Sequence, residues 1–264
     1  MEIRKYLPDT LFAGKVVFVT GGGSGVNLGI ARNFAALGAN VGICGRSQDR
    51  LDAARAELRK LGAQVVGSVA DVRDDRALAA AFEKTRTELG PIHTLVCGAA
   101  GNFLCPAERM TPNGFRAVVE IDLIGAFNAS RAAFEHLRET RGNVIFISAP
   151  QAFVPFPGQA HAGAAKAGVD NLMRNLALEW GPYGIRSNGI APGAVENTEG
   201  VRRLVGDETA GRFRRAIPLG RFGTTDEMGH AAVFLASPLA RYITGALLIV
   251  DGGQSLLGFG GLVA

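Results

Sequence analysis

The chain has 264 residues and contains little cysteine and no long apolar run. Its three cysteines, Cys44, Cys97 and Cys105, form neither a CxxC pair nor an even set. This pattern disfavours a disulfide scaffold and favours small buried side chains in a reducing compartment, and we expect no metal. No stretch of 18 apolar residues occurs, and the N-terminus lacks a cationic segment followed by an apolar one. We therefore expect a cytoplasmic protein without a membrane span.

The sequence also lacks a tract of Lys and Arg. Its 28 basic residues exceed its 24 acidic residues by four, but they are scattered along the chain, so nucleic acid binding is not expected. Hydrophobic residues make up 47% of the chain, which is enough for one α/β domain with a buried sheet. We predict a single domain over residues 1–264.

Short β-branched runs alternate with longer segments of helical periodicity. The expected strands are apolar on both faces, as in a buried parallel sheet, and cover residues 16–20, 41–44, 65–69, 92–96, 144–147, 186–190 and 247–250. Helices are predicted over 28–37, 49–61, 74–89, 114–140, 160–180 and 225–236. The alternation predicts a doubly wound, Rossmann-type, seven-stranded parallel sheet with helices on both faces. Residues 196–221 are expected to be irregular and to form a lid.

A glycine cluster follows the first strand and precedes a helix. In this context the backbone amides can approach a pyrophosphate, and the helix N-terminus favours negative charge. The alternative is a structural turn without a ligand. The spacing resembles that of the short-chain dehydrogenase/reductases, with asparagine at their third glycine; because asparagine tolerates left-handed backbone, we expect the turn to survive. The predicted cofactor loop comprises Gly21, Gly22, Gly23, Ser24, Gly25, Val26 and Asn27.

The second strand ends in Arg46 and Ser47, where an NAD-selective enzyme would place a carboxylate. A guanidinium cannot accept hydrogen bonds from ribose hydroxyls, but it can bind a 2′-phosphate, with help from Ser47 and Arg50. This arrangement favours NADP(H). The alternative is a solvated surface arginine.

Further cofactor positions follow from the family resemblance. Asp71 and Val72 match the adenine-binding position of short-chain dehydrogenase/reductases. The segment after the sixth strand matches the part that meets the nicotinamide, through Pro192, Gly193, Val195 and Thr198.

Several longer motifs resemble one subfamily in particular. These motifs are the stretch 97–107 with its Ala-Ala-Gly-Asn-Phe, the pair Ile121-Asp122, the stretch 161–170 and Thr198-Glu199-Gly200. Together they resemble the corresponding motifs of the peroxisomal-type 2,4-dienoyl-CoA reductases. The likeness extends from about Gly14 to Gly253, although the targeting tail of that subfamily is absent. It implies an acyl-CoA substrate, a ribose-binding Lys166, a water-orienting Asp170 and a homotetramer built by helices 114–140 and 160–180. It also implies substrate contacts from Arg46, Arg73, Asn102, Phe103, Thr111, Pro112 and Asn113.

One position departs from the superfamily pattern. The helix that should carry the catalytic tyrosine has Ala162 one turn before Lys166, and the superfamily serine is Ala149. Reduction of a ketone leaves an alkoxide that needs a positioned acid. A conjugated dienoyl thioester differs, because hydride added at the δ-carbon gives an extended enolate whose oxygen needs stabilisation and whose α-carbon takes the proton. Asp170, one helical turn after Lys166, is expected to hold the water that delivers this proton.

Other interpretations of these residues stay open. Lys166 and Asp170 at this spacing can form a simple ion pair, and Asp122 can either bond to backbone or adjust Lys166 by its charge. His161 is predicted to face away from Lys166 and to be structural. For function, the alternatives are another short-chain reductase acting on an enoyl or carbonyl substrate, or an idle NADP-binding protein.

Overall fold

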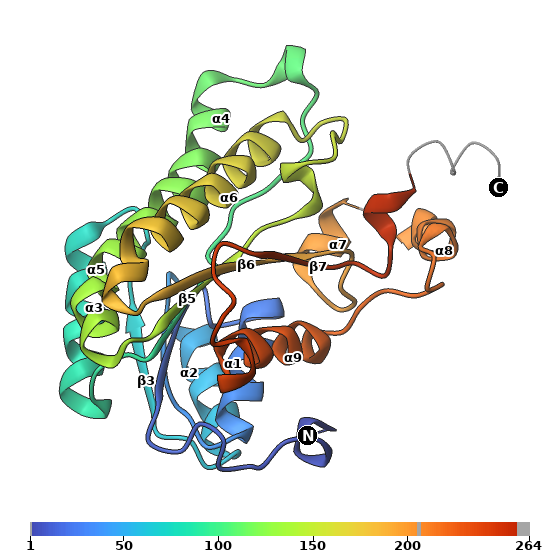
Figure 1. Ribbon diagram of the computed structural model, residues 1–264. Helices are drawn as coiled ribbons and strands as arrows, with labels where there is room; N and C mark the ends of the chain where they lie inside the picture. The colour runs from blue at the N-terminus through green and yellow to red at the C-terminus, as the bar shows by residue number, and fades with distance from the viewer. Residues whose placement is uncertain (1, 205–206, 258–264) are drawn as a thin grey trace.

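The computed structural model describes residues 2–204 and 207–257, and its centre is the predicted parallel sheet (Figure 1). Seven strands lie in the order β3-β2-β1-β4-β5-β6-β7, and each pairing is parallel. Strand β1 is buried along its whole length, because parallel strands covered on both faces have no wet side. The strands are β1 (Val16–Thr20), β2 (Asn40–Gly45), β3 (Val65–Val69), β4 (Thr94–Cys97), β5 (Asn143–Ile147), β6 (Arg186–Pro192) and β7 (Leu247–Val250).

Helices cover both faces of the sheet, which confirms the doubly wound Rossmann-type fold (Figure 1). Val17 and Val19 of β1 pack into one core with α1 (Gly25–Ala36), α2 (Gln48–Arg59) and α9 (Thr225–Ala236). Val16 and Phe18 point the other way, into a second core with α3 (Asp75–Leu89), α5 (Gly125–Thr140) and α6 (Ala160–Trp180). The alternation follows from the two-residue period of a strand. Each large apolar side chain so buried contributes about 1.5–3 kcal/mol.

The long helix predicted over 114–140 forms, but with an interruption. It begins as α4 (Pro112–Val119), passes through one π turn (Glu120–Ile124) and continues as α5. Thr111 starts it by accepting a hydrogen bond from the amide of Gly114, and Pro112 occupies the first turn. A π turn inserts one extra residue and so rotates the side chains that follow. Here it carries Asp122.

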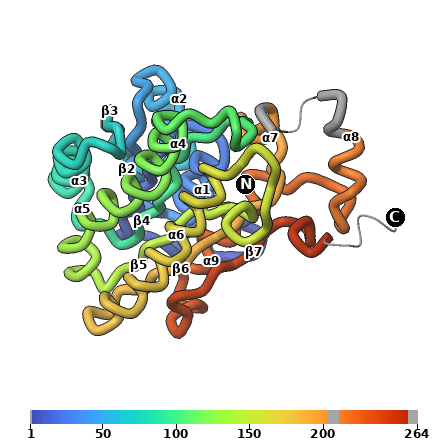
Figure 2. Tube along the Cα trace, turned by 90° about the horizontal axis from the view of Figure 1, so that it is seen from above, coloured from blue at the N-terminus to red at the C-terminus, as the bar shows by residue number. Residues whose placement is uncertain are grey.

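The expectation that residues 196–221 are irregular is wrong. The segment contains two helices, α7 (Glu199–Leu204) and α8 (Asp207–Ala216). Arg214 and Arg215 lie in the last turn of α8, where cations favour a helix. The guanidinium of Arg214 also lies 4.9 Å from the centre of the Phe222 ring, a contact that sequence periodicity does not reveal. In Figures 1 and 2, α8 lies at the opposite end of the molecule from α3. Whether the segment acts as a lid stays a prediction.

Over the described parts of the chain, no helix is long and apolar enough to cross a membrane.

Candidate active site

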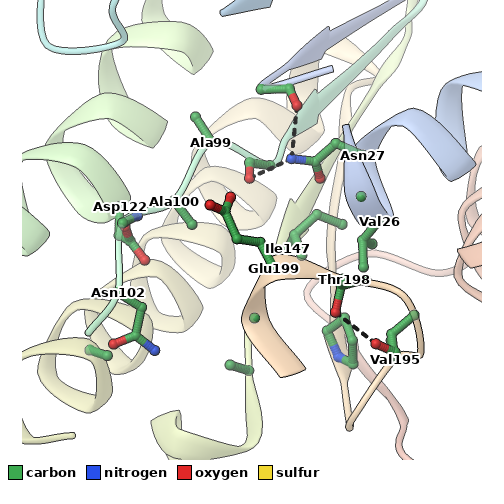
Figure 3. A pocket seen from close by; sticks show the side chains of 18 of the residues that line it. Val26, Asn27, Ala99, Ala100, Asn102, Asp122, Ile147, Val195, Thr198 and Glu199 are labelled. Atoms are coloured by element: carbon green, nitrogen blue, oxygen red, sulfur yellow. Dashed lines mark hydrogen bonds between the residues drawn. The ribbon is translucent and has the colours of Figure 1, made fainter. Parts of the chain in front are cut away.

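A cavity of about 1040 Å³ opens at the carboxyl edge of the sheet. It lies where the strand order reverses between β1 and β4, the place where doubly wound sheets bind ligands. Strands β1 to β6 each contribute residues from their carboxyl ends or from the loops that follow them: Gly21, Arg46, Asp71, Gly98, Ser148 and Pro192. Figure 3 shows that its walls come from segments far apart in the sequence.

The glycine loop forms one end of this cavity. Gly21 and Gly25 have φ of 68° and 59°, left-handed values that favour glycine. Ser24 precedes α1, but its side chain makes no cap hydrogen bond within the described chain, so the first amides of α1 are left for another acceptor. An uncapped helix N-terminus on a cavity wall fits the pyrophosphate of a dinucleotide. The predicted loop residues that line the cavity are Gly21, Gly23, Ser24, Gly25, Val26 and Asn27.

Gly22 acts through packing instead. A Cβ placed on Gly22 would lie 2.6 Å from Cγ2 of Ile43, so glycine at this position allows the loop to lie against β2. It is not among the described residues that line the cavity.

Asn27 keeps the turn intact, but not for the predicted reason. It lies inside α1 and has no positive φ; the left-handed residues of the loop are Gly21 and Gly25. Its Nδ2 donates to the carbonyl of Gly98 at 2.7 Å and to that of Gly21 at 3.4 Å, as Figure 3 shows. Asn27 therefore ties the glycine loop to the end of β4, a contact between positions 71 residues apart.

The basic residues predicted to bind the 2′-phosphate lie together on the cavity wall. Arg46 and Ser47 follow β2 and are exposed. The Ser47 hydroxyl accepts from the amide of Arg50 at 3.4 Å and caps α2. The Arg50 guanidinium lies 3.8 Å from the carboxylate of Glu199, at the start of α7. Glu199 thus brings a negative charge to the end of the cavity that is predicted to bind the 2′-phosphate, a role that its motif did not indicate.

Asp71 and Val72 also line the cavity. Arg73 holds Asp71 through contacts of 3.0 Å and 2.6 Å, and this hydrogen bonding lowers the pKa of the Asp71 carboxyl. Arg73 itself, predicted to contact coenzyme A, is not among the described residues of the cavity wall.

Lys166 reaches the cavity from α6 and is paired with Asp122. The Lys166 ammonium lies 3.1 Å from Asp122 Oδ2 and donates to the carbonyl of Ile147 at 2.9 Å. The side chains of Lys166 and Asp122 are only 9% and 2% exposed. Asp122 Oδ1 accepts from the amide of Gly101 at 2.7 Å. Asp122 thus bonds to backbone, one of the two roles that the sequence left open, and it also forms a buried ion pair with Lys166.

Asp170 lies one turn further along α6 and is 5% exposed. Burial raises the pKa of its carboxyl, while Ser148, Arg174 and Lys166 lower it. Its Oδ1 is buried and has no hydrogen-bond partner among the described residues. Asp170 is not among the described residues that line the cavity. This position argues against direct contact between Asp170 and a substrate.

The structure confirms that no phenol stands at the position of the superfamily tyrosine. Ala162 and Ala149 both line the cavity. The three tyrosines, Tyr6, Tyr183 and Tyr242, are between 47% and 101% exposed. None of these belongs to the described cavity wall, so no tyrosine substitutes for the missing acid.

The predicted substrate residues divide into two groups. Asn102 lines the cavity, and its amide donates to Gln159 Oε1 at 2.7 Å. Phe103 does not line it within the described chain; its ring packs 4.5 Å from that of His161. His161 is fully buried and likewise outside the cavity wall, as predicted. Outside this wall, at the start of α4, are Thr111, Pro112 and Asn113.

Gln159 is a residue that the sequence did not single out. It is 3% exposed, and its Nε2 donates to the carbonyl of Phe103 at 3.0 Å. It therefore joins the loop after β4 to the start of α6. Its only sequence signal is its place immediately before the helix.

The loop after β6, which the family resemblance places near the nicotinamide, forms another part of the cavity wall. Pro192, Gly193, Val195 and Thr198 all line it, as predicted. The Thr198 hydroxyl donates to the Val195 carbonyl at 2.6 Å, shown as a dashed line in Figure 3. Asn197 between them has φ of 57°, so the loop turns sharply here.

Comparison with known proteins shows what this site resembles. The family model described as enoyl-(acyl carrier protein) reductase matches residues 21–255. The chain is 42% identical to the peroxisomal 2,4-dienoyl-CoA reductase [(3E)-enoyl-CoA-producing] of Saccharomyces cerevisiae, over 95% of this chain and 87% of the relative. It is also 42% identical to a probable 2,4-dienoyl-CoA reductase [(2E)-enoyl-CoA-producing] of Bacillus subtilis, over 92% of this chain and 97% of the relative.

Solved structures agree with this likeness. A short chain dehydrogenase from Bacillus anthracis is 40% identical with a TM-score of 0.83, and the match covers 91% of this chain and 96% of that chain. A gluconate 5-dehydrogenase from Burkholderia cenocepacia, solved in complex with NADP and tartrate, is 30% identical with a TM-score of 0.87, covering 94% of this chain and 98% of that chain. The chain therefore belongs to the short-chain dehydrogenase/reductase family of nicotinamide-dependent oxidoreductases.

Proposed function

We propose that the protein reduces 2,4-dienoyl-CoA thioesters to enoyl-CoA with NADPH. One observation carries the proposal: the charge-paired Lys166 lies beside Ala162, without a phenol, and a second buried carboxylate, Asp170, follows one turn later. The names of the yeast and Bacillus relatives support the same substrate class.

The chemistry of a dienoyl thioester suits this set of residues. When bound, NADPH supplies the hydride, which adds to the δ-carbon and leaves an extended enolate. The enolate oxygen needs electrostatic stabilisation, and the proton finally goes to the α-carbon. The product double bond then lies between the β- and γ-carbons, which agrees with the (3E) product in the name of the yeast relative. An isolated ketone would instead need a proton at oxygen during the step, and Ala162 has none to give.

The arrangement of donors favours NADP(H) over NAD(H). Arg46, Ser47 and Arg50 stand at the end of β2, where a ribose 2′-phosphate would lie. The uncapped N-terminus of α1 would hold the pyrophosphate. The ammonium of Lys166 reaches the same cavity and would hold the nicotinamide ribose.

Coenzyme A would be bound mostly outside the cavity. Arg73 and the Thr111-Pro112-Asn113 turn are not among the described residues of the cavity wall, and the guanidinium of Arg73 suits a phosphate of coenzyme A. The acyl chain would enter past Asn102, the predicted substrate residue that does line the cavity.

A second candidate is an enoyl reductase, which the description of the matching family model favours. The test is NADPH oxidation with 2,4-hexadienoyl-CoA beside 2-hexenoyl-CoA and 3-ketohexanoyl-CoA. The proposal predicts turnover with the dienoyl substrate alone. Turnover of the enoyl or ketoacyl substrate without turnover of the dienoyl substrate would select another reductase, and no turnover with any would refute all three activities.

We also propose a homotetramer. Large apolar side chains are exposed along the helices expected to form its interfaces: Phe115 of α4, Ile124 of the π turn, Phe127 of α5 and Leu178 of α6, the last 78% exposed. Large apolar side chains left exposed on a surface are typical of subunit contacts. Light scattering coupled to size exclusion should give four times the monomer mass of 27.6 kDa.

A cytoplasmic location is proposed on the basis of the thiols. All three cysteines are free, and Cys44 and Cys97 are buried, as expected in a reducing compartment. Fractionation of cells that express the chain tests this.

A further inference from the structure

The buried position of Asp170 raises the question of how its proton reaches a substrate. Asp170 is 5% exposed and lies outside the described cavity wall. A proton donor must come within hydrogen-bond reach of the accepting atom, directly or through one intervening group. Some group between Asp170 and the cavity is therefore needed.

Ser148 stands in that place. It follows β5, and its amide donates to the Ile190 carbonyl at 2.7 Å, so the extended backbone continues to this residue. Along β5, Ile145 and Ile147 belong to the core on the α1 side, whereas Val144 and Phe146 belong to the core on the α6 side. By the two-residue period, Ser148 points toward α6 and Ala149 away from it.

Ser148 and Asp170 each have a buried side-chain oxygen that lacks a hydrogen-bond partner among the described residues. Ser148 is 3% exposed, and both Ser148 Oγ and Asp170 Oδ1 are buried without a completed hydrogen bond to any described residue. Leaving buried polar atoms in this state costs stability. The Ser148 hydroxyl is nevertheless close enough to lower the pKa of Asp170. Unlike Asp170, Ser148 lines the cavity. The other charged groups that act on Asp170 are Lys166 and Arg174.

We infer that Ser148 is a proton-relay residue, whose hydroxyl connects the carboxyl group of Asp170 to the cavity beside Ala162. The inference rests on the proposed function and deepens it. The superfamily serine at position 149 is not simply lost; a hydroxyl one residue earlier faces the opposite side of the strand and serves a different acid.

The step balances as follows. Bound NADPH would supply the hydride for the new bond at the δ-carbon and leave as NADP⁺, and the substrate would become an enolate. The Ser148 hydroxyl passes its proton to the water beside it, and that water protonates the α-carbon. Ser148 takes a proton from the carboxyl group of Asp170, which is left as a carboxylate and is protonated again from solvent. The sum is one dienoyl-CoA, one NADPH and one proton giving one enoyl-CoA and one NADP⁺.

The test compares Ser148→Ala, Ser148→Thr and Asp170→Asn in the full-length protein, with hexadienoyl-CoA and NADPH as substrates. We expect Ser148→Ala to lower kcat by at least about tenfold, within the range of proton-transfer catalysis, with the KM for NADPH unchanged. Ser148→Thr keeps the hydroxyl and should retain most of the activity. The variant Ser148→Ala/Asp170→Asn should be no slower than Asp170→Asn alone, because the two residues act on one proton.

A matched control tests whether the hydroxyl must be at position 148 or can act from elsewhere in the cavity. Ser148→Ala combined with Ala149→Ser moves the hydroxyl to the other face of the strand, and it should not restore turnover. The pH dependence of kcat gives a readout that simple loss of packing would not change: in Ser148→Ala the limb that reports Asp170 should move to higher pH, because the hydroxyl lowers the pKa of Asp170.

The outcomes are distinguishable. A wild-type protein that leaves hexadienoyl-CoA unreduced refutes the proposed function, and the relay with it. An active wild type together with a fully active Ser148→Ala refutes the relay alone. The relay would also be overturned if the losses of kcat in the two single variants multiplied in the double variant, or if Ala149→Ser restored turnover to Ser148→Ala. If Ser148→Ala unfolds, Ser148→Gly, which also removes the hydroxyl, makes the same comparison.

Discussion

Replacement of Asp170 by asparagine should lower activity and raise stability at the same time. Asn has nearly the shape of Asp but cannot supply a proton. If Asp170 is the source of the proton for the α-carbon, kcat should fall by about 10²–10⁴-fold, which corresponds to about 3–5 kcal/mol in the activation free energy. The Kd for NADPH should change little, because Asp170 lies outside the described cavity wall.

Stability should move in the opposite direction because the carboxylate is buried at a cost. Burial disfavours the charged form of Asp170 and raises the pKa of its carboxyl. A neutral amide of nearly the same shape avoids that cost, a gain on the order of 1 kcal/mol. For a chain of this size, that change raises Tm by about 2–4 °C.

The sign of the pH dependence follows from the direction of the pKa shift. Burial raises the pKa of Asp170 in the folded protein, so the folded state holds this proton more tightly than the unfolded chain does. The stability that this provides is complete below the unfolded pKa and is lost as pH rises through the folded pKa. The Tm advantage of Asp170→Asn should therefore be larger at about pH 8 than at about pH 4.

The assay pairs steady-state kinetics with thermal unfolding and NADPH titration. Glu179→Gln is the matched control, since Glu179 is an exposed carboxylate on the same helix and should change neither quantity. A fully active Asp170→Asn would remove Asp170 from the reaction. A variant with lower Tm and unchanged kcat would show that the carboxylate is structural.

Three further substitutions test other parts of the site. Asp122→Ala should destabilise the fold by about 3–5 kcal/mol in chemical denaturation, because it leaves the buried Lys166 ammonium unpaired; a loss below about 1 kcal/mol would contradict the pairing. Arg46→Asp should weaken NADPH binding by about tenfold or more in calorimetry and improve NADH binding, since each charged hydrogen bond is worth about 1.5–3 kcal/mol; equal affinities before and after would remove Arg46 from the cofactor site. Gly22→Ala should cost about 1–3 kcal/mol of stability, because the new Cβ would lie 2.6 Å from Ile43; an unchanged unfolding midpoint would mean that the loop can move away at no cost.

The elements themselves were largely predictable from local pattern. The strand at 16–20 and the helices at 160–180 and 225–236 have the predicted bounds. A strand buried on both faces appears in the sequence as a continuous apolar run, and a helix appears as apolar residues at the helical period. The glycine loop, Arg46 and the absence of a phenol at Ala162 were equally visible, since each follows an element whose end the sequence marks.

What only the tertiary structure decided are contacts between residues distant in the chain. Asn27 holds the glycine loop through Gly98 rather than through its own backbone, and Asp122 meets Lys166 because a π turn rotates it inward. Ser148 lowers the pKa of Asp170 from another element, and α8 contacts Phe222 through Arg214. Residue order encodes which face of an element is apolar, but not which polar groups meet once the elements pack. The pairing of Lys166 with Asp122 therefore arises only in the folded chain.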